Sequence, residues 1–426
     1  MLYQRWLQIA KAFSDRSALW DLAAGRKWTF TEIAARIEQS PPVKAETAFP
    51  QGGSAEFVFT VLQAWRNNQV VCPLEEGQAP NLSDSLPPGT VHVKTTSATT
   101  GASRLVAFRP EQLMADADNI VLTMGLKAEC PNLGVISLAH SYGFSNLVLP
   151  LLLHGVPLIL VGSGFPEALR RAAALEPEVT LPGVPALWRH WHEADAIPPN
   201  VRLAISAGAP LPSKLERAVY ERHQLKIHNF YGSTECGGIA YDASSEPRAE
   251  TSCVGSPIRN VHLSVNASGC LEVRSRAVGQ TYWPLPRDNL KDGVFQTSDL
   301  AEIRDGMIYL LGRAGDQINV AGRKVSPEII EQALASHPQV RECVAFGVAN
   351  PQGERGEIIV ACLAVTGQVG SDTLKQYLMT KLPPWQVPRE WRFVDQVAAN
   401  HRGKLSRADW RKQYLAETAT IDSSRP

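Results

Sequence analysis

The sequence predicts an α/β protein with a large N-terminal domain of βαβ-type sheets, a small antiparallel β piece, and a small α+β C-terminal domain on a hinge. Three observations lead to this prediction. The 426 residues exceed the length at which one hydrophobic core usually stops growing. Strand-like and helix-like runs alternate through the first part of the chain, which is the rhythm of βαβ units. The pattern then changes twice, near residue 250 and again at residue 317.

Four apolar runs in the alternating part have strand character. They are VISLAH (135–140), VPLILVG (156–162), VRLAISAG (201–208) and LKIHNFYG (225–232). Between the last two, Ser213 and Glu216 have the spacing of a capping box that opens the amphipathic stretch KLERAVYERH. Strands separated by helices predict a parallel sheet with helices on its faces.

One apolar stretch, residues 143–162 (GFSNLVLPLLLHGVPLILVG), approaches the length that spans a bilayer. It contains Asn146, His154 and two prolines, which favours a buried helix, a turn at His154 and Gly155, and a buried strand. The N-terminal sequence MLYQRWLQIAKAF has too short an apolar run for a signal peptide. We therefore expect a cytoplasmic protein without a membrane span.

Charge and cysteine content argue against several classes of protein. The 42 basic residues balance the 42 acidic ones, which gives no electrostatic basis for binding nucleic acid or an anionic membrane. The seven cysteines are scattered, with no CxxC pair and no zinc spacing, so we expect reduced thiols.

After about residue 250, short strands with Gly and Pro turns (VGSPI, VHLSV, CLEVRS, GMIYLLGR) predict the antiparallel piece. From Gln317 onward, two helices and three strands predict a compact α+β unit, whose first helix should begin at Ser326 as N-cap and Pro327 at N1. We therefore expect an N-terminal domain at residues 1–312, a hinge at 313–316 and a mobile C-terminal domain at 317–426.

A hydroxyl-rich turn, Thr95 to Gly101, follows the strand-like run VHVK, with Arg104 beside it. Consecutive backbone N–H groups and short hydroxyls wrap phosphate oxygens, although such a run is often only a solvated loop. A second motif, Asn229 to Glu235, lies at the carboxyl end of a strand, where parallel sheets place ligands. Its aromatic ring suits a purine, its hydroxyl a phosphate oxygen and its carboxylate Mg²⁺.

Two further motifs lie near the C-terminal end. Asp299 is placed to bind sugar hydroxyls, and Arg313 follows it at the expected domain boundary. The basic loop around Lys404 comes last. Taken singly, each has an ordinary alternative: a turn aspartate, a surface arginine and a solvated loop.

Together, the order and spacing of the four motifs resemble the adenylate-forming (AMP-binding) superfamily, of the acyl-CoA and aryl-CoA synthetase type. The resemblance runs from about residue 90 to residue 412. The residues that match ATP or AMP ligands are Ser97, Thr99, Thr100, Gly101 and Arg104 in the phosphate loop, Gly208, Ala209 and Pro210 beside the adenine, Asn229, Tyr231 and Gly232 in and before the YG-x-TE motif, and Asp299 and Arg313 at the ribose. Thr234, Glu235 and Lys404 match catalytic positions.

The resemblance implies a two-step reaction. The carboxylate of the substrate attacks the α-phosphorus of ATP and pyrophosphate leaves, with Mg²⁺ held by Glu235 and the ammonium of Lys404 aimed at the charge on the phosphates. The C-terminal domain then swings about Gly315 and brings the thiol-tunnel loop of Gly322 to the site. There the thiol of CoA, or of a carrier protein's phosphopantetheine, displaces AMP.

The segment His140-Ser141-Tyr142-Gly143-Phe144 occupies the acyl-pocket motif of the family, with His140 as a catalytic candidate. The apolar side chains expected to line the pocket are Phe144, Val184, Phe230 and Ile239, although each is also compatible with an ordinary core position. No aspartate stands in the motif to pair with an α-ammonium group, so we expect a fatty or aromatic acid.

Three departures from the family pattern leave alternatives open. In the phosphate loop, Ala98 stands in place of a glycine and Arg104 in place of a lysine, and Gly315 occupies a hinge position that is commonly Asp or Lys. Residues 1–94 make an abbreviated first part. One alternative is a ligase that charges an acyl carrier protein, because no CoA-specific feature excludes it. The other is a non-catalytic paralogue that binds an acyl-adenylate or a nucleotide.

Overall fold

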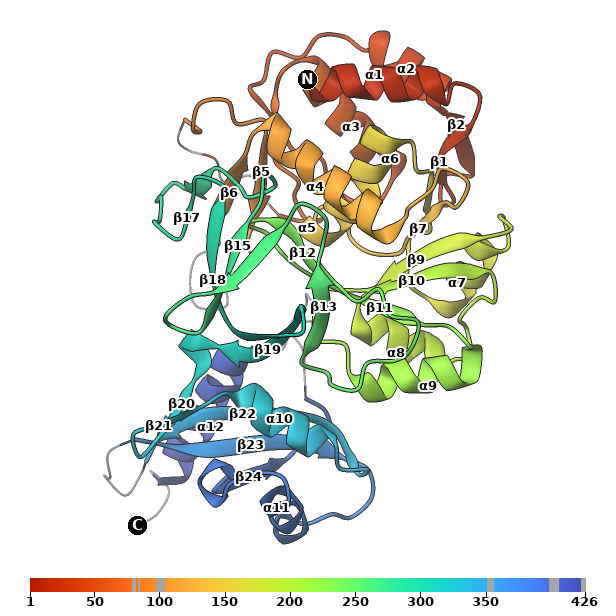
Figure 1. Cartoon of the computed structure of the whole chain (residues 1–426). Helices are drawn as coiled ribbons and strands as arrows, with labels where there is room; N and C mark the ends of the chain where they lie inside the picture. The colour runs from red at the N-terminus through yellow and green to blue at the C-terminus, as the bar shows by residue number, and fades with distance from the viewer. Residues whose placement is uncertain (79–81, 83–84, 97–103, 351–355, 398–405, 423–426) are drawn as a thin grey trace.

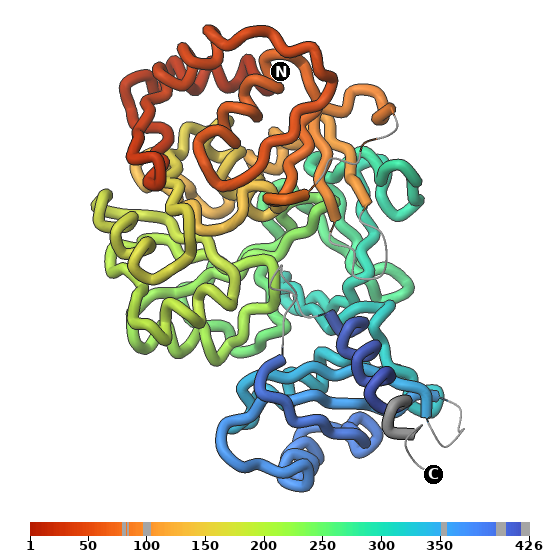
Figure 2. Tube along the Cα trace, turned by 180° about the vertical axis from the view of Figure 1, so that it is seen from behind, coloured from red at the N-terminus to blue at the C-terminus, as the bar shows by residue number. Residues whose placement is uncertain are grey.

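The computed structural model describes residues 1–78, 82, 85–96, 104–350, 356–397 and 406–422. Residues 419–422 are described by their backbone alone. Figures 1 and 2 show a large body that contains the N-terminus and a smaller lobe that carries the C-terminal part of the chain. The α/β class is confirmed.

The main sheet of the large body has 14 strands and mixes two kinds of pairing. Its order is β14-β15-β18-β19-β13-β12-β11-β10-β9-β7-β8-β1-β2, with β17 beside β18. Strands β11, β10, β9, β7, β8 and β1 are parallel, and the remaining pairs are antiparallel. The bounds are β1 (Ser17–Asp21), β2 (Arg26–Thr29), β7 (Asn132–Gly134), β8 (Leu158–Leu160), β9 (Val179–Gly183), β10 (Val201–Ser206), β11 (Ile227–Ser233), β12 (Gly237–Tyr241), β13 (Cys253–Pro257), β14 (His262–Val265), β15 (Cys270–Arg274), β17 (Leu290–Lys291), β18 (Val294–Arg304) and β19 (Met307–Arg313).

A second, five-stranded sheet lies beside the main one in the order β16-β6-β5-β4-β3. Its strands are β3 (Thr47–Ala48), β4 (Val70–Val71), β5 (His92–Thr95), β6 (Leu105–Phe108) and β16 (Thr281–Trp283). Strands β5 and β6 flank the predicted phosphate loop, and β16 pairs with β6 although it lies far along the chain. This sheet therefore joins the loop region to the segment around residue 282.

Helices pack around these sheets and bury two apolar clusters. They are α1 (Leu2–Ala12), α2 (Phe30–Glu38), α3 (Ala55–Arg66), α4 (Pro110–Met124), α5 (Ser141–Gly143), a π-helical turn (Phe144–Val148), α6 (Leu149–His154), α7 (Pro166–Ala173), α8 (Pro185–Glu193) and α9 (Ser213–His223). The expectation for residues 143–162 is confirmed, because the buried helix ends at His154, Gly155 has a positive φ of 73° and β8 follows. Among the described helices, none combines the length and apolar character that a membrane crossing requires.

The C-terminal lobe has apolar clusters of its own. Its elements are β20 (Ile318–Val320), β21 (Arg323–Val325), α10 (Pro327–Ala335), β22 (Val340–Ala349), β23 (Glu357–Val365), α11 (Ser371–Met379), β24 (Glu390–Phe393) and α12 (Arg407–Asp422), with short 3₁₀ turns at Ala314–Asp316 and Pro384–Gln386. Alternate residues of β22 face opposite sides: Val344 and Phe346 belong to the cluster that includes Trp410 of α12, and Ala345 to the cluster of α10 and α11. The three-stranded sheet is thus covered by helices on both faces.

Two expectations about local structure are wrong. The strand near residue 135 is β7, which ends at Gly134, while residues 135–140 form a loop. Ile136 and Ala139 of this loop pack against the main core, so their apolar character comes from loop packing and not from a strand. The capping box is also absent, because α9 has Pro212 as N-cap and the Glu216 side chain bonds to Lys226 and Arg248.

Candidate active site

The turn between β11 and β12 carries Thr234 and Glu235, which the sequence predicts at the phosphates of ATP. Since β11 is parallel to β10, this turn follows the carboxyl end of a parallel strand, where open α/β sheets bind ligands. The two strands are close together at the turn: a Cβ atom on Gly232 would lie 2.6 Å from the carbonyl oxygen of Gly237. Glycine at position 232 is therefore required by the local backbone.

Four predicted segments converge at this edge of the sheet. The hydroxyl of Tyr142, from the acyl-pocket motif, donates a hydrogen bond to the carbonyl oxygen of Gly183 (3.4 Å), and its ring centroid lies 6.3 Å from that of Phe230. A Cβ atom on Gly208 would lie 3.5 Å from Val184 Cγ1. Residues predicted beside the acyl group and the adenine therefore lie next to one another, and Phe230 belongs to β11, the strand that leads to Thr234 and Glu235.

Asp299 and Arg313, the predicted ribose ligands, lie opposite each other on β18 and β19. Arg313 Nε lies 3.1 Å from Asp299 Oδ1, and the hydroxyl of Tyr231 donates to Asp299 Oδ2 at 2.6 Å. Burial and the charge of Asp299 raise the pKa of Tyr231 well above its usual value, so its hydroxyl stays protonated. The contact between Tyr231 and Asp299 was not foreseen from the sequence, because 68 residues separate the two.

The carboxylate of Glu235 is bonded to a residue that the sequence did not single out. The hydroxyl of Tyr282 donates to Glu235 Oε1 at 3.0 Å. Burial and the charge of Glu235 raise the pKa of Tyr282, so this hydroxyl also acts as a donor. The guanidinium of Arg104, in the described end of the phosphate loop, lies 6.0 Å from the centroid of the Tyr282 ring.

His140 lies beside a second carboxylate, Glu75, that sequence patterns did not reveal. His140 Nε2 is 3.3 Å from Glu75 Oε1, and the hydroxyl of Ser137 donates to the same oxygen at 2.7 Å. Glu75 is thus placed to orient the His140 ring at the start of the acyl-pocket motif.

The apolar residues predicted for the acyl pocket differ in their surroundings. Phe144, Phe230 and Ile239 are buried in the main core, and the ring centroid of Phe144 lies 4.4 Å from that of His92. Val184 is half-buried. Their role at an acyl group stays a prediction.

Two predicted segments are only partly covered by the structure. Ser97, Ala98, Thr99, Thr100, Gly101 and Lys404 lie outside the described residues. In the adenine-flanking segment, Gly208 has a positive φ of 85°, Ala209 is half-buried and Pro210 is exposed. Asn229 is buried, and its carbonyl oxygen accepts from the backbone N–H of Asp242 at 2.9 Å.

The start of α10 packs against the end of β19. Pro327 is at N1 and Ser326 is the N-cap as expected, but the Ser326 side chain makes no capping bond. A Cβ atom on Gly312 would clash with Ser326 Oγ and Glu328 Oε2. Gly312 therefore permits the C-terminal lobe to lie close to the ribose side of the site.

Arg407, three positions after Lys404, pairs with Asp316 of the expected hinge and with Glu328 and Glu331 of α10. Its guanidinium lies 3.1 Å from Asp316, 2.8 Å from Glu328 and 2.7 Å from Glu331. Gly315 has open space around its Cβ position and no positive φ, so no steric contact requires glycine there. Gly322, with a φ of 86°, forms the turn between β20 and β21, where its N–H donates to Asn319 Oδ1 at 2.9 Å.

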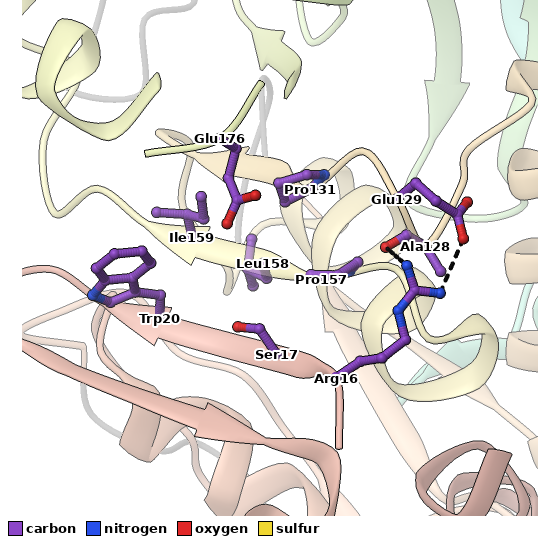
Figure 3. A pocket seen from close by; sticks show the side chains of 10 residues that line it. All are labelled: Arg16, Ser17, Trp20, Ala128, Glu129, Pro131, Pro157, Leu158, Ile159 and Glu176. Carbon is purple, nitrogen blue, oxygen red and sulfur yellow. Dashed lines mark hydrogen bonds and ion pairs between the residues drawn. The ribbon is translucent and has the colours of Figure 1, made fainter. Parts of the chain in front are cut away.

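A separate small pocket lies on another part of the large body (Figure 3), between β1, β8 and the loop before β7. Its wall includes the ion pair of Arg16 and Glu129, at 2.9 Å, and the side chain of Trp20. None of the predicted site residues lines it.

Comparison with known protein families decides the classification. The model of the AMP-binding enzyme family matches residues 58–283, which is more than half of the chain, and the model of the AMP-binding enzyme C-terminal domain matches residues 329–404. The chain belongs to the AMP-binding enzyme family. Within this adenylate-forming family it is an AMP-forming enzyme of the acyl-CoA ligase type.

Similar members of the AMP-binding family act on different acids. A feruloyl-CoA synthase from an Amycolatopsis species is 26% identical over 341 residues, which cover 75% of this chain and 69% of the relative. A long-chain-fatty-acid–CoA ligase of Mycobacterium tuberculosis is also 26% identical, with 75% and 67% covered. A 2-succinylbenzoate–CoA ligase of Bacillus licheniformis is 27% identical over 357 residues, with 80% and 72% covered.

Solved structures of AMP-binding enzymes share the whole fold. ATP-bound MatB of Rhodopseudomonas palustris superposes with a TM-score of 0.85 at 19% identity, over 97% of this chain and 99% of the other. The o-succinylbenzoate CoA synthetase of Bacillus subtilis, in complex with its acyl-adenylate intermediate, gives 0.83 at 18% identity, over 96% and 97%. These likenesses establish the fold of both the large body and the C-terminal lobe.

Proposed function

We propose that this enzyme converts a fatty or aromatic carboxylic acid and ATP into an acyl-adenylate and pyrophosphate, and then transfers the acyl group to the thiol of CoA. The observation that carries the proposal is the convergence of Tyr142, Val184, Gly208 and Phe230 beside the turn of Glu235 at the carboxyl ends of parallel strands. The feruloyl and long-chain fatty acyl ligases among the relatives support this substrate class.

In the first step, an oxygen of the substrate carboxylate forms a bond to the α-phosphorus as the bond to the pyrophosphate oxygen breaks. Negative charge builds on the phosphate oxygens, and the hydroxyls of Thr99 and Thr234 and the ammonium of Lys404 are assigned to stabilise it. Lys404 is also assigned to align the carboxylate with the phosphate. Asp299 and Arg313 hold the ribose, so that the α-phosphate stays in one place.

The donor set at Glu235 fits Mg²⁺. The described residues include no group of three or more His, Cys, Asp or Glu side chains arranged as a metal site. Mg²⁺ is usually bound by one or two carboxylates together with substrate phosphates, and Glu235 supplies a single carboxylate beside the hydroxyl of Thr234. When bound there, Mg²⁺ neutralises the phosphate charge that develops in the first step.

In the second step, the thiol attacks the acyl carbonyl carbon and AMP leaves, while the thiol proton goes to solvent. We assign Gly315 as the hinge and Gly322 as the thiol-tunnel residue, with the boundaries 1–312, 313–316 and 317–426. Arg407 supports this assignment, because its ion pair with Asp316 links the C-terminal helix to the hinge segment. His140, which lies beside Glu75, is assigned as a catalytic residue in the acyl-pocket motif.

An ATP–pyrophosphate exchange assay with a panel of short, medium, long and aromatic acids tests this proposal. We expect exchange with at least one fatty or aromatic acid, and a thioester when CoA is added. Thioester formation with an acyl carrier protein, and none with CoA, would identify a carrier-protein ligase. A lack of exchange with every acid, despite measurable ATP binding, would identify a non-catalytic binding protein.

A further inference from the structure

Glu235 is held by contacts on both its side chain and its main chain. The Tyr282 hydroxyl donates to Glu235 Oε1 at 3.0 Å, and the N–H of Gly279 donates to the Glu235 carbonyl oxygen at 2.8 Å. Tyr282 lies on β16, opposite Val106 of β6, the strand that leaves the predicted phosphate loop. The position of the Glu235 carboxylate is therefore tied to the phosphate side of the site.

A buried carboxylate, Asp116 of α4, contacts the backbone at the start of β12, directly after the same turn. Asp116 is 2% exposed, and its Oδ1 accepts from the N–H of Gly238 at 3.1 Å. A Cβ atom on Gly237 would clash with this carboxylate, so the backbone of the turn lies directly on it. Asp116 Oδ2 accepts from the hydroxyl of Ser145 at 2.6 Å, and Ser145 directly follows the acyl-pocket motif, in the π-helical turn Phe144–Val148.

Lys94 supplies the opposite charge. Its ammonium is buried, lies 3.6 Å from Asp116 Oδ2 and donates to Ser145 Oγ at 3.0 Å. Burial lowers the pKa of Lys94, and the charges of Asp116 and Glu235 oppose that shift. Because Lys94 is in the strand that enters the phosphate loop, this ion pair connects the entering strand to the Glu235 turn, as Tyr282 does for the strand that leaves the loop.

We propose that Tyr282 and the buried pair of Asp116 and Lys94 are positioning residues that hold Glu235 in the orientation that binds Mg²⁺–ATP. The proposal rests on the assignment of Glu235 as the Mg²⁺ ligand made above. Tyr282 fixes the carboxylate itself, and Asp116 fixes the backbone that carries it. Outer partners that orient metal-binding carboxylates typically change metal affinity when they are removed.

The direct test is Tyr282→Phe, which removes only the hydroxyl. The readout is the Mg²⁺ concentration at half-maximal binding of ATP, measured by calorimetry without any acid substrate. We expect this concentration to rise by about tenfold, the lower end of the effect of outer-shell changes. The thermal unfolding temperature should stay close to that of the wild type, because the aromatic ring remains in place.

Tyr220→Phe is the matched control. The hydroxyl of Tyr220, on α9, also donates to a glutamate, Glu246, at a distance of 3.1 Å. It should leave the Mg²⁺ requirement unchanged. An unchanged Mg²⁺ requirement in Tyr282→Phe, or an equal rise in Tyr220→Phe, would overturn the positioning role.

Asp116→Asn tests the contact between Asp116 and the backbone of Gly237 and Gly238. We expect it to raise the Mg²⁺ requirement for ATP binding and to lower the unfolding temperature, because Lys94 loses its counter-charge. Asp242→Asn is the comparison, since Asp242 is another buried carboxylate paired with a lysine, 2.5 Å from Lys226. It should lower the unfolding temperature without changing the Mg²⁺ requirement. A change of the same size in both variants would show a general loss of stability and contradict the proposal.

These outcomes are separable from failure of the proposed function. If Glu235→Gln leaves the Mg²⁺ requirement unchanged, then Glu235 is not the metal ligand and the proposed function loses that assignment. If Glu235→Gln raises the requirement and Tyr282→Phe does not, the ligand assignment stands and the positioning role alone is wrong.

Discussion

The two sides of the candidate site are held in different ways. On the large-domain side, the turn of Glu235 is supported by the buried carboxylate of Asp116 and by the hydroxyl of Tyr282. On the C-terminal side, the contacts of Arg407 with Asp316 and Glu331 are partly exposed ion pairs between side chains. Breaking a buried ion pair leaves a charge without its partner and costs about 3–5 kcal/mol, whereas an ion pair that water reaches costs less to break. The swing proposed for the C-terminal lobe would leave the contacts of Arg407 with Glu328 and Glu331 in place, since all three residues belong to that lobe.

The largest expected effect tests the C-terminal side, for which we propose a swing between the two steps. Lys404→Ala should lower adenylate formation by about a hundred- to a thousandfold, since it removes a group assigned to the charge that develops on the phosphates. It should largely spare thioester formation from a supplied acyl-adenylate. Separate assays of ATP–pyrophosphate exchange and of thioester release measure the two steps. Equal losses in both would show that Lys404 has no step-specific role.

A second change tests how much a buried ion-pair cluster contributes to the stability of the large body. Lys226 is buried between Glu216 and Asp242. Lys226→Met should lower the free energy of unfolding by about 3–5 kcal/mol, because it leaves buried carboxylates without their cation. Urea unfolding measures this. Lys291→Met, at the exposed ion pair with Asp288, is the control and should change stability little.

The same network predicts a pH dependence of stability. Burial alone would raise the pKa of Asp242, but bonds from Lys226 and Ser244 outweigh it and lower this pKa below its usual value. A carboxyl with a lowered folded-state pKa contributes stability above its unfolded pKa of about 3.9, and this contribution is lost as the pH falls through the folded value. Unfolding of the wild type should therefore become easier below about pH 4. A weaker acid dependence in Lys226→Met, measured over the same range, is expected, and an identical one would contradict this account.

A third change tests the ribose contact on the large-domain side. Asp299→Ala should raise the KM for ATP by about ten- to hundredfold, the range for losing a hydrogen bond to a charged group. Asp305→Asn, at the far end of the same hairpin, is the control. Steady-state kinetics with saturating acid checks this. If both variants keep the wild-type KM, Asp299 does not hold the ribose.

The smallest expected effect concerns the hinge. Gly315→Pro should leave adenylate formation in place and slow the thiol step, because proline restricts the backbone rotation that the swing requires. A Cβ atom at position 315 would meet no other atom within 4 Å. An unchanged rate of thioester formation would remove the hinge assignment.

The fold class and several elements after residue 150 were predictable, because their apolar residues recur with the period of a strand or of a helix. The parallel strands β8, β10 and β11, the antiparallel piece and the C-terminal elements lie where the apolar runs placed them. The strand expected at 135–140 was wrong, because Ile136 and Ala139 are apolar for loop packing. Local sequence also suggested a cap at Ser213, whereas Glu216 serves a buried ion pair that forms only in the folded protein.

Sequence motifs predicted the site residues themselves. They could not predict the residues that support the site, because those lie far from the motifs along the chain. Tyr282 and Glu235 are 47 positions apart, and no local pattern links them. The burial of Asp116 could have been predicted from the sequence. Asp116 lies on the buried face of α4, at helical spacing from Leu113, Ala117 and Ile120. A charged residue on such a face indicates a buried partner, and Lys94 in the apolar strand VHVK is that partner.

The central claim is that a substrate carboxylate attacks the α-phosphorus of ATP. It is tested most directly with an acid whose carboxylate carries ¹⁸O, in a reaction that contains CoA and is followed by mass spectrometry of the products. The account predicts that AMP contains one ¹⁸O atom from the acid and that pyrophosphate contains none. Label in pyrophosphate, or a reaction that yields ADP and phosphate in place of AMP, would contradict it.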